Sequence, residues 1–320
     1  MTVDIPVPLK AAERVEITTL IDNYVDLLLP PSEIMTRPPL AKDGNILADT
    51  LLAEHGLSLL VTVYNGEKKN TILFDTGYTK VGVPHNMEML GINAEDIEAV
   101  VISHGHMDHT GSLDAVLDKI PGRIPLVLHP GAYVYPRYTA TPDGDKRLWP
   151  QTLVKEDLEQ KNVDIVESKE PTLIADDRIM VTGEVERVTE FEKGMPNALV
   201  EKDGKIVQDP ILEDQALVIK LKEKGLVVIS GCAHSGIVNT VMFAQKMTGE
   251  QNIHAVLGGF HLTGPFFEKI HDPTIAELKK MAPDVVMPMH CTGWKAIQKF
   301  QKEFSSQFVL NSVGSKMTLS

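Results

Sequence analysis

Four side chains that can bind metal fall within six residues of this chain, in the segment His104-Gly105-His106-Met107-Asp108-His109. Three imidazoles and a carboxylate this close together would crowd one another unless a cation held them. The segment directly follows the apolar run 99–103, which is typical of a strand buried on both faces. In a loop leaving such a strand, His104 and His106 can point to one side while the next turn carries Asp108 and His109 to a neighbouring point. The spacing therefore predicts a site for two metal ions.

The donor types indicate which metal and which chemistry to expect. Imidazole nitrogen combined with carboxylate oxygen favours zinc, with iron or manganese as alternatives. A metal pair held in this way can acidify a water molecule for hydrolysis, or act as a Lewis acid on a phosphoryl or carbonyl oxygen. The competing interpretation, a purification tag or a surface histidine cluster, does not suit a segment in mid-chain behind an apolar strand.

The elements that must position these residues alternate between strand and helix. Residues 15–21 predict a strand, and residues 57–64 and 71–74 predict a hairpin around a polar, glycine-containing turn. From residue 98 onward, we expect strands at 99–103, 124–128, 226–230, 253–257 and 284–287, and helices at 112–120, 237–247, 273–281 and 294–304. The proline-rich stretch 30–43 predicts an irregular loop or lid. Residues 130–150 show no periodicity and are expected to be a substrate-facing insertion.

Composition excludes several classes of function. The 320 residues are 43% hydrophobic and carry 31 Lys and Arg against 44 Asp and Glu, a formal charge of −13. Such an acidic surface disfavours nucleic acid and anionic membranes, so the expected partner is a small molecule. Two cysteines, Cys232 and Cys291, cannot build a disulfide framework. Residues 1–15 lack the apolar core of a secretion signal, so a cytoplasmic location is expected. The oligomeric state stays open.

Several segments together resemble a known family. The His104–His109 segment behind its strand resembles the HxHxDH motif of the metallo-β-lactamase superfamily, and Leu73-Phe74-Asp75-Thr76-Gly77 resembles that family's first motif. The site segments further resemble one subgroup, the 7,8-dihydropterin-6-methyl-4-(β-D-ribofuranosyl)-aminobenzene-5′-phosphate synthases of methanopterin biosynthesis. They include Gly231-Cys232-Ala233-His234, Gly258-Gly259-Phe260-His261 and Met287-Pro288-Met289-His290-Cys291-Thr292-Gly293.

The resemblance covers about residues 15–320 and implies an α/β fold, a four-layer αββα sandwich. We expect a flexible N-terminal arm at residues 1–14, followed by a single metallo-β-lactamase-fold domain at residues 15–320. The resemblance assigns the first metal to His104 and His106, and the second to Asp108, His109 and His290. It also makes Asp75 the buried carboxylate that accepts hydrogen bonds from the HxHxDH loop.

Two features of the usual family pattern are missing, a third histidine for the first metal and an aspartate that bridges both metals. In their places the chain reads Thr182-Gly183-Glu184 and Gly231-Cys232-Ala233-His234. We favour His234 as the third imidazole. Cys232 is expected to be a small buried packing residue, with a thiolate ligand as the alternative. Glu184 is either a metal ligand or, equally, an ion-pair or substrate contact. Without a bridging aspartate the second metal should bind less tightly, so one or two ions are expected.

Other residues are candidates for contact with the substrate. Asp108 and His261 are the candidate catalytic residues, although His261 is equally suited to a hydrogen-bonded loop. Aromatic side chains that would stack on a flat ring, or simply pack in a loop, are Tyr133, Tyr135, Tyr138 and Trp149. Cations that would contact phosphate, or pair with carboxylates, are Arg137, Arg147 and Arg187. His55 is expected to be structural.

Three classes of function remain after these steps. The leading hypothesis is a metal-dependent enzyme acting on a small phosphorylated substrate. Its most specific form is the synthase reaction, in which metals and cations hold a diphosphate while the aminobenzene partner attacks the pterin methyl carbon and pyrophosphate leaves. A generic zinc-dependent phosphoester or lactone hydrolase is the alternative within this class. The second class is a non-catalytic protein with a degenerate metal site. The third, a flavodiiron redox protein, is disfavoured by a histidine at position 106 and by the lack of a flavin domain.

Overall fold

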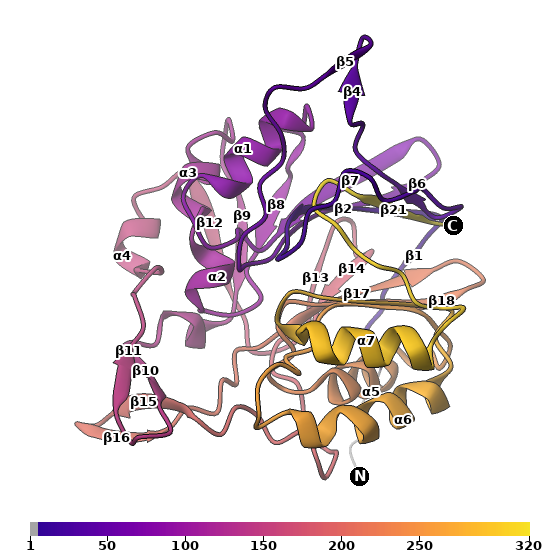
Figure 1. Ribbon diagram of the computed structural model, residues 1–320. Coiled ribbons are helices and arrows are strands. Elements are labelled where there is room, and N and C mark those ends of the chain that lie inside the picture. Colours follow the sequence, from indigo (N-terminus) through magenta and orange to yellow (C-terminus); the bar gives the residue numbers. More distant parts are fainter. Residues whose placement is uncertain (1–5) are drawn as a thin grey trace.

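The computed structural model describes residues 6–320, which contain two large β-sheets packed face to face (Figure 1). In this range the first sheet has eight strands, in the order β12-β9-β8-β7-β6-β2-β21-β3. Their bounds are β2 Arg14–Ile21, β3 Met35–Thr36, β6 Ser58–Asn65, β7 Lys68–Phe74, β8 Ala99–Val101, β9 Ile124–Leu128, β12 Val163–Glu167 and β21 Lys316–Leu319. Strands β6 and β7 form the expected antiparallel hairpin, and β7, β8, β9 and β12 run parallel.

The second sheet has seven strands within the same described range. Six lie in the order β13-β14-β17-β18-β19-β20, and β1 pairs with β17. Their bounds are β1 Ala11–Ala12, β13 Thr172–Ile174, β14 Ile179–Val181, β17 Ala216–Leu221, β18 Gly225–Ser230, β19 Ile253–Gly259 and β20 Val285–Met289. Strands β18, β19 and β20 run parallel, as the predicted alternation of strand and helix requires.

Helices cover the outer face of each sheet. The helices are α1 Gly82–Met89, α2 Met107–Thr110, α3 Leu113–Leu117, α4 Lys155–Leu158, α5 Ile237–Thr248, α6 His271–Met281 and α7 Trp294–Glu303. Short 3₁₀ turns lie at Ala94–Asp96, Pro130–Tyr133, Glu268–Ile270 and His290–Thr292. Helices α1 and α3 pack on the first sheet, and α5, α6 and α7 pack on the second. Each predicted helix is present, with ends within a few residues of the prediction.

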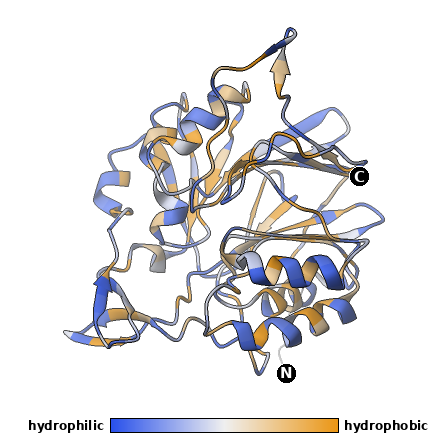
Figure 2. Cartoon of the chain, in the orientation of Figure 1, coloured by the Kyte–Doolittle hydropathy of each residue, from blue (hydrophilic) through white to orange (hydrophobic). Residues whose placement is uncertain are grey.

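The alternation of side chains along each strand produces the four layers. On β18, Val227 and Ile229 enter the core between the two sheets, and Val228 packs against the helices outside. On β8, Val101 faces the inter-sheet core and Val100 faces the outer helices. Strands buried on both faces must be apolar throughout. Figure 2 shows hydrophobic colouring on strands in the interior and mixed colouring on the helices that cover them. The expected αββα sandwich is confirmed.

The parallel strands direct their carboxyl ends to one edge of the molecule. Asp75 follows β7, His104 follows β8, Cys232 follows β18, and His261 and His290 follow β19 and β20. Loops at the carboxyl ends of parallel strands meet in space, which brings together residues far apart in the sequence. No helix among the described residues has the length and apolar character needed to cross a membrane.

Within the segment expected to be a flexible arm, residues 1–14, residues 7–12 pair with the body of the fold. The Val7 amide donates to the Met247 carbonyl, and the Lys10 amide donates to the Asp177 carbonyl. Ala11 and Ala12 then form β1 beside β17. β1 pairs with Lys220 and Leu221 at the end of β17, beyond the part of β17 that pairs with β14. The proline-rich composition of the segment does not signal this long-range pairing. Residues 1–5 of the expected arm lie outside the described residues.

Two segments expected to be irregular contain short strands. Residues 30–43 include β3, which pairs with β21, and part of the hairpin of β4 Ala41–Lys42 and β5 Asn45–Ile46. Residues 130–150 contribute β10 Arg137–Ala140 and β11 Lys146–Leu148 to a small sheet. Its other strands are β15 Ala198–Lys202 and β16 Lys205–Gln208, and the sheet projects from the body of the fold (Figure 1). Its strands are short and largely exposed, so they lack the apolar runs that revealed the large sheets.

Candidate metal centre

The segment after β8 turns its ligands in two directions. Gly105 lets the backbone pass close to the next loop, because a Cβ there would lie 2.0 Å from the Ala132 carbonyl oxygen. His106 precedes the first turn of α2 with an extended backbone, and the helical turn then carries Asp108 and His109 away from it. His104 and His106 therefore join one set of side chains and Asp108 and His109 join another, as the sequence predicted.

The first set consists of three buried imidazoles. His234 Nε2 lies 3.2 Å from His104 Nε2 and 3.2 Å from His106 Nδ1. Nitrogens bound at ~2.0–2.1 Å to one tetrahedral zinc ion lie ~3.3 Å apart, so this spacing fits a shared cation. Burial, reinforced by neighbouring positive groups, holds the pKa of each ring well below its ordinary value. The rings are therefore neutral near pH 7, the form in which imidazole binds metal.

The second set combines a carboxylate with two imidazoles. Asp108 Oδ2 lies 3.4 Å from His290 Nε2 and 3.9 Å from His109 Nε2. All three residues are buried, and His290 comes from the far end of the chain, after β20. Although burial favours the neutral acid, the nearby His109 and His290 rings hold the pKa of Asp108 below its usual range. The ionised carboxylate is a suitable ligand for a divalent cation.

Cys232 lies between the two sets and belongs to both. Its Sγ is 3.2 Å from His109 Nε2. Its donor atom also lies within 4.8 Å of those of His104 and His234 on one side, and of Asp108 and His290 on the other. Burial, followed by the adjacent Cys291, raises the pKa of the Cys232 thiol, and a bound cation would reverse this by deprotonating it. The position supports the ligand alternative over a packing role, in the place where the family pattern has its bridging aspartate.

Asp75 supports the second set through a hydrogen bond to His109 on its buried side. Its carboxylate is fully buried and accepts hydrogen bonds from the Ser103 amide, the Ser103 hydroxyl and His109 Nδ1, each at 2.7 Å. Burial opposes a charge on His109, but the Asp75 carboxylate outweighs it and raises the pKa of His109 to about 9. Without a metal the ring is therefore protonated on both nitrogens near pH 7. A bound cation would displace the Nε2 proton, while the Nδ1 proton stays directed at Asp75. This geometry fits the role that the resemblance implied.

Backbone strain concentrates at the centre. Asp75, Ala233, His261 and His290 have φ angles of 61°, 52°, 41° and 51°, a left-handed region that residues other than glycine rarely adopt. Each such residue costs on the order of 1–3 kcal/mol, which the surrounding structure must offset. Three of them follow directly after, or one residue beyond, a strand whose carboxyl end meets the site. The strain turns side chains from separate strands toward one point.

His261 lies beside the first set. Its ring centroid is 4.3 Å from that of His234 and 4.9 Å from that of Phe267. Its buried Nδ1 has no hydrogen-bond partner in the part of the chain that the structure describes. A ring nitrogen of His261 lies within 4.8 Å of the sulfur atoms of Cys232 and Cys291. It lines a narrow cavity with His234 and Phe267, so its placement is compatible with contact to a substrate.

Of the other candidate substrate contacts, the structure places Trp149 beside the metal ligands and gives Arg187 partners within the protein. Trp149 packs edge-on against His106 with ring centroids 4.1 Å apart, so it borders the metal centre. Tyr133 and Trp149 line one pocket beside Gly105, and burial, followed by the nearby Glu167 carboxylate, raises the pKa of the Tyr133 phenol. Arg187 donates to the carbonyls of Pro210 and Ile211.

Three further candidates also have partners or positions away from the ligands. Glu184 lies outside both donor sets, and its carboxylate is 3.2 Å from both Lys169 Nζ and His129 Nε2. This ion pair is the alternative that the sequence left open. Arg137 is buried in ion pairs with Asp209 and Glu213, and Arg147 is exposed on the small sheet.

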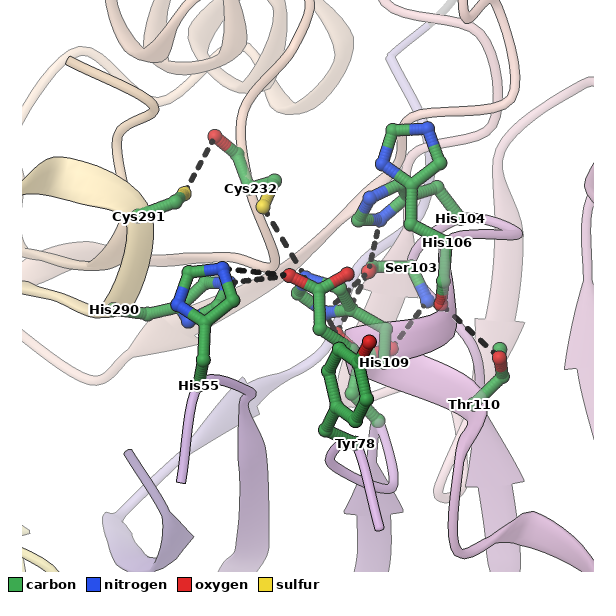
Figure 3. A network of polar contacts seen from close by, with 12 residues as sticks. His55, Tyr78, Ser103, His104, His106, His109, Thr110, Cys232, His290 and Cys291 are labelled. Atoms are coloured by element: carbon green, nitrogen blue, oxygen red, sulfur yellow. Dashed lines mark hydrogen bonds and ion pairs between the residues drawn. The ribbon is translucent and has the colours of Figure 1, made fainter. Parts of the chain in front are cut away.

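Sequence reasoning missed two residues on the wall of the second set. Asn23 follows β2 and its Oδ1 lies 3.2 Å from His290 Nδ1. His55, expected to be structural, places Nε2 3.6 Å from Asp108 Oδ2, with its ring 5.1 Å from that of His290. Figure 3 shows His55 beside His290, with His109 and Cys232 across the centre. The polar pair Asp22-Asn23 at the end of an apolar strand was the available signal.

Comparisons with known proteins agree with this architecture. Residues 53–190 match the family model of the metallo-beta-lactamase superfamily. The chain is 35% identical to the 7,8-dihydropterin-6-methyl-4-(β-D-ribofuranosyl)-aminobenzene-5′-phosphate synthase of Methanocaldococcus jannaschii, over 80% of this chain and 87% of that protein. An uncharacterized protein of the same organism is 34% identical over 82% of this chain and 92% of its own length.

Solved structures show the same fold. A crystal structure of a metal-dependent hydrolase of the β-lactamase superfamily aligns with a TM-score of 0.70 and 26% identity, over 96% of this chain and 98% of that one. A metallo-β-lactamase fold protein from Bacillus subtilis aligns with a TM-score of 0.51 and 11% identity, over 96% and 100% of the two chains.

Proposed function

Because the chain belongs to the metallo-β-lactamase superfamily, we propose that it is a zinc-dependent enzyme acting on a small phosphorylated substrate. The observation that carries the proposal is the convergence of two buried donor sets that share Cys232. Imidazole, carboxylate and thiolate donors favour zinc, with iron and manganese as the alternatives. When bound, the ions polarise a phosphoryl oxygen as Lewis acids and acidify water.

The protein's own residues divide the work at this centre. In the proposal, His104, His106 and His234 hold the first ion, and Asp108, His109 and His290 hold the second. Cys232 lies within reach of both sets and would contribute a thiolate to the centre. Because the imidazoles of the first set are uncharged, an ion held there would keep much of its positive charge for an anionic substrate.

The surroundings of the centre suit a substrate with a flat ring. Trp149 packs on His106 from the small sheet and offers an aromatic face at the border of the first set. His261 stands next to His234 with an unpartnered buried nitrogen. We assign both to substrate contact, Trp149 through its ring and His261 through a hydrogen bond.

The specific reaction that we propose is the one named for the relative from Methanocaldococcus jannaschii. In this reaction the aminobenzene partner forms a bond to the methyl carbon of the dihydropterin, and the bond from that carbon to the diphosphate oxygen breaks. Pyrophosphate leaves with the electron pair, and the attacking group gives up one proton to solvent. The similarity to the relative spans most of both chains, which supports this choice. Hydrolysis is the second candidate, favoured by the structural likeness to a metal-dependent hydrolase at a TM-score of 0.70.

One assay separates these functions. Zinc-loaded protein is incubated with dihydropterin-methyl diphosphate, with and without the ribofuranosyl-aminobenzene phosphate, and pyrophosphate and coupled product are measured by mass spectrometry. Release that requires both substrates and yields the coupled product supports the synthase. Release from the diphosphate alone supports a hydrolase. A fully metal-loaded protein that releases nothing from either mixture contradicts both.

A further inference from the structure

The backbone of His55 is fixed next to the second donor set. The Glu54 amide donates to the Asp22 carbonyl, and the Glu54 carboxylate accepts from the amides of Tyr78 and Thr79 at 2.8 and 3.1 Å. Gly56 permits a close approach to the α2 loop, since a Cβ there would lie 2.9 Å from the Asp108 carbonyl oxygen. The His55 side chain is nevertheless 61% exposed, so a rigid segment presents an accessible ring beside buried ligands.

The amide of Asn23 fixes the proton positions on two histidines. Its Nδ2 lies 3.3 Å from the His290 backbone carbonyl, which can only accept a hydrogen bond, so this end of the amide must be the NH₂ group. The second hydrogen of that group is directed at His55 Nδ1, 3.3 Å away. The Asn23 Oδ1 faces His290 Nδ1 at 3.2 Å.

This arrangement gives the two neighbouring rings opposite tautomers. With a cation bound, His290 donates from Nδ1 to Asn23 and directs its Nε2 lone pair to the metal, as a ligand must. His55 accepts at Nδ1 and so carries its proton on Nε2. A ring with Nε2 protonated cannot coordinate a cation through that atom, which excludes His55 Nε2 as an additional ligand in this arrangement.

Among residues 6–320, the Nε2–H group of His55 has no partner within ordinary hydrogen-bond distance. It lies 3.6 Å from Asp108 Oδ2, beyond ordinary hydrogen-bond distance, and its ring is open to solvent. An N–H donor held there suits an anionic oxygen whose other lone pair faces the second metal. The buried guanidinium of Arg137 and the hydrogen-bonded group of Arg187 are already engaged with protein acceptors.

We propose that His55 is a substrate-binding residue, which donates from Nε2 to a non-bridging phosphoryl oxygen at the second donor set, with Asn23 as the residue that positions its proton. The inference rests on the proposed function only in that it requires a phosphorylated ligand at a metal-loaded centre. It assigns the phosphoryl group to the side of the centre formed by His55 and His290, opposite Trp149.

The test measures binding rather than turnover, with inorganic pyrophosphate as the probe and the zinc-loaded full chain. Calorimetry of His55→Ala should give a pyrophosphate Kd about tenfold higher than wild type, the loss of one hydrogen bond to a charged oxygen. Zinc content should stay at the wild-type value. His55→Gln, whose amide can donate from nearly the same point, should recover most of the affinity. His85→Ala on α1 is the matched control, because its ring bonds to the Thr50 carbonyl away from the centre.

A second variant tests the role of Asn23 independently. In Asn23→Asp, the carboxylate still accepts from His290 Nδ1 but can no longer donate to His55 Nδ1. Nitrogen-15 spectra of the imidazoles should show His55 as the Nε2–H form in wild type and a shift toward the Nδ1–H form in Asn23→Asp. The pyrophosphate Kd should rise as in His55→Ala.

Three results would overturn the assignment. One is loss of a zinc ion from His55→Ala, which would make His55 a ligand. Another is pyrophosphate binding that is unchanged in His55→Ala or absent in wild type. The third is an Nδ1–H form of His55 in wild type. None depends on the synthase assay: a protein that fails to turn over but binds pyrophosphate through His55 would refute the proposed reaction and leave this inference standing.

Discussion

The substitution Asp75→Asn tests how the second donor set is held. It preserves the volume of the side chain but removes its charge and converts one acceptor oxygen into an NH₂ group. The Oδ1 position accepts from the Ser103 amide and so remains the oxygen. The NH₂ group then faces the Ser103 hydroxyl and His109 Nδ1. His109 can only accept from it, which moves the ring proton to Nε2, the nitrogen 3.2 Å from Cys232 Sγ.

The expected result is weaker binding of the second zinc ion. Loss of a partner behind a metal-bound histidine costs about 10- to 100-fold in metal affinity, or ~1.4–2.7 kcal/mol. Competition against a chromophoric chelator at pH 7 measures this for each ion, and circular dichroism checks the fold. Ser58→Ala is the matched control, because its hydroxyl donates to the Asp75 backbone carbonyl and not to the carboxylate. Unchanged affinity in Asp75→Asn, or an equal loss in Ser58→Ala, would refute the reasoning.

Three further predictions follow from the same contacts. Cys232→Ser should weaken both sites and abolish the thiolate-to-metal absorption of the cobalt-substituted protein; an unchanged spectrum would show that Cys232 only packs. His261→Ala should retain metal and lose at least tenfold in kcat, and a loss of metal instead would make His261 a ligand. Burial raises the pKa of Glu192 to about 7 from 4.5, so its stabilising contribution is complete below pH 4.5 and lost as pH rises through 7. Relative to wild type, zinc-free Glu192→Gln should therefore gain about 3 kcal/mol of unfolding free energy between pH 4.5 and 7 in urea titrations, and parallel profiles would contradict this.

The large sheets and the ligand loop could be predicted from the sequence because their signals are local. Strands buried on both faces are continuous apolar runs, and the His104–His109 segment contains four potential metal ligands within six residues. The small sheet could not be predicted, because β11 is exposed throughout and β10 pairs with residues about sixty positions away. Asn23 acts on His290, 267 positions away. A single asparagine has no recognisable sequence pattern. Only the folded structure shows that Asn23 contacts the rings of both His55 and His290.

The central claim is that two metal ions bind at one centre, held by residues that follow three strands, β8, β18 and β20. A crystal structure of the zinc-loaded protein, with anomalous data at the zinc edge, tests this most directly. We predict one ion within ~2.0–2.3 Å of His104, His106 and His234, a second at the same range from Asp108, His109 and His290, and Cys232 Sγ in contact with both. A zinc ion bound away from these side chains, or a centre in which His290 and His234 are not ligands, would contradict the account.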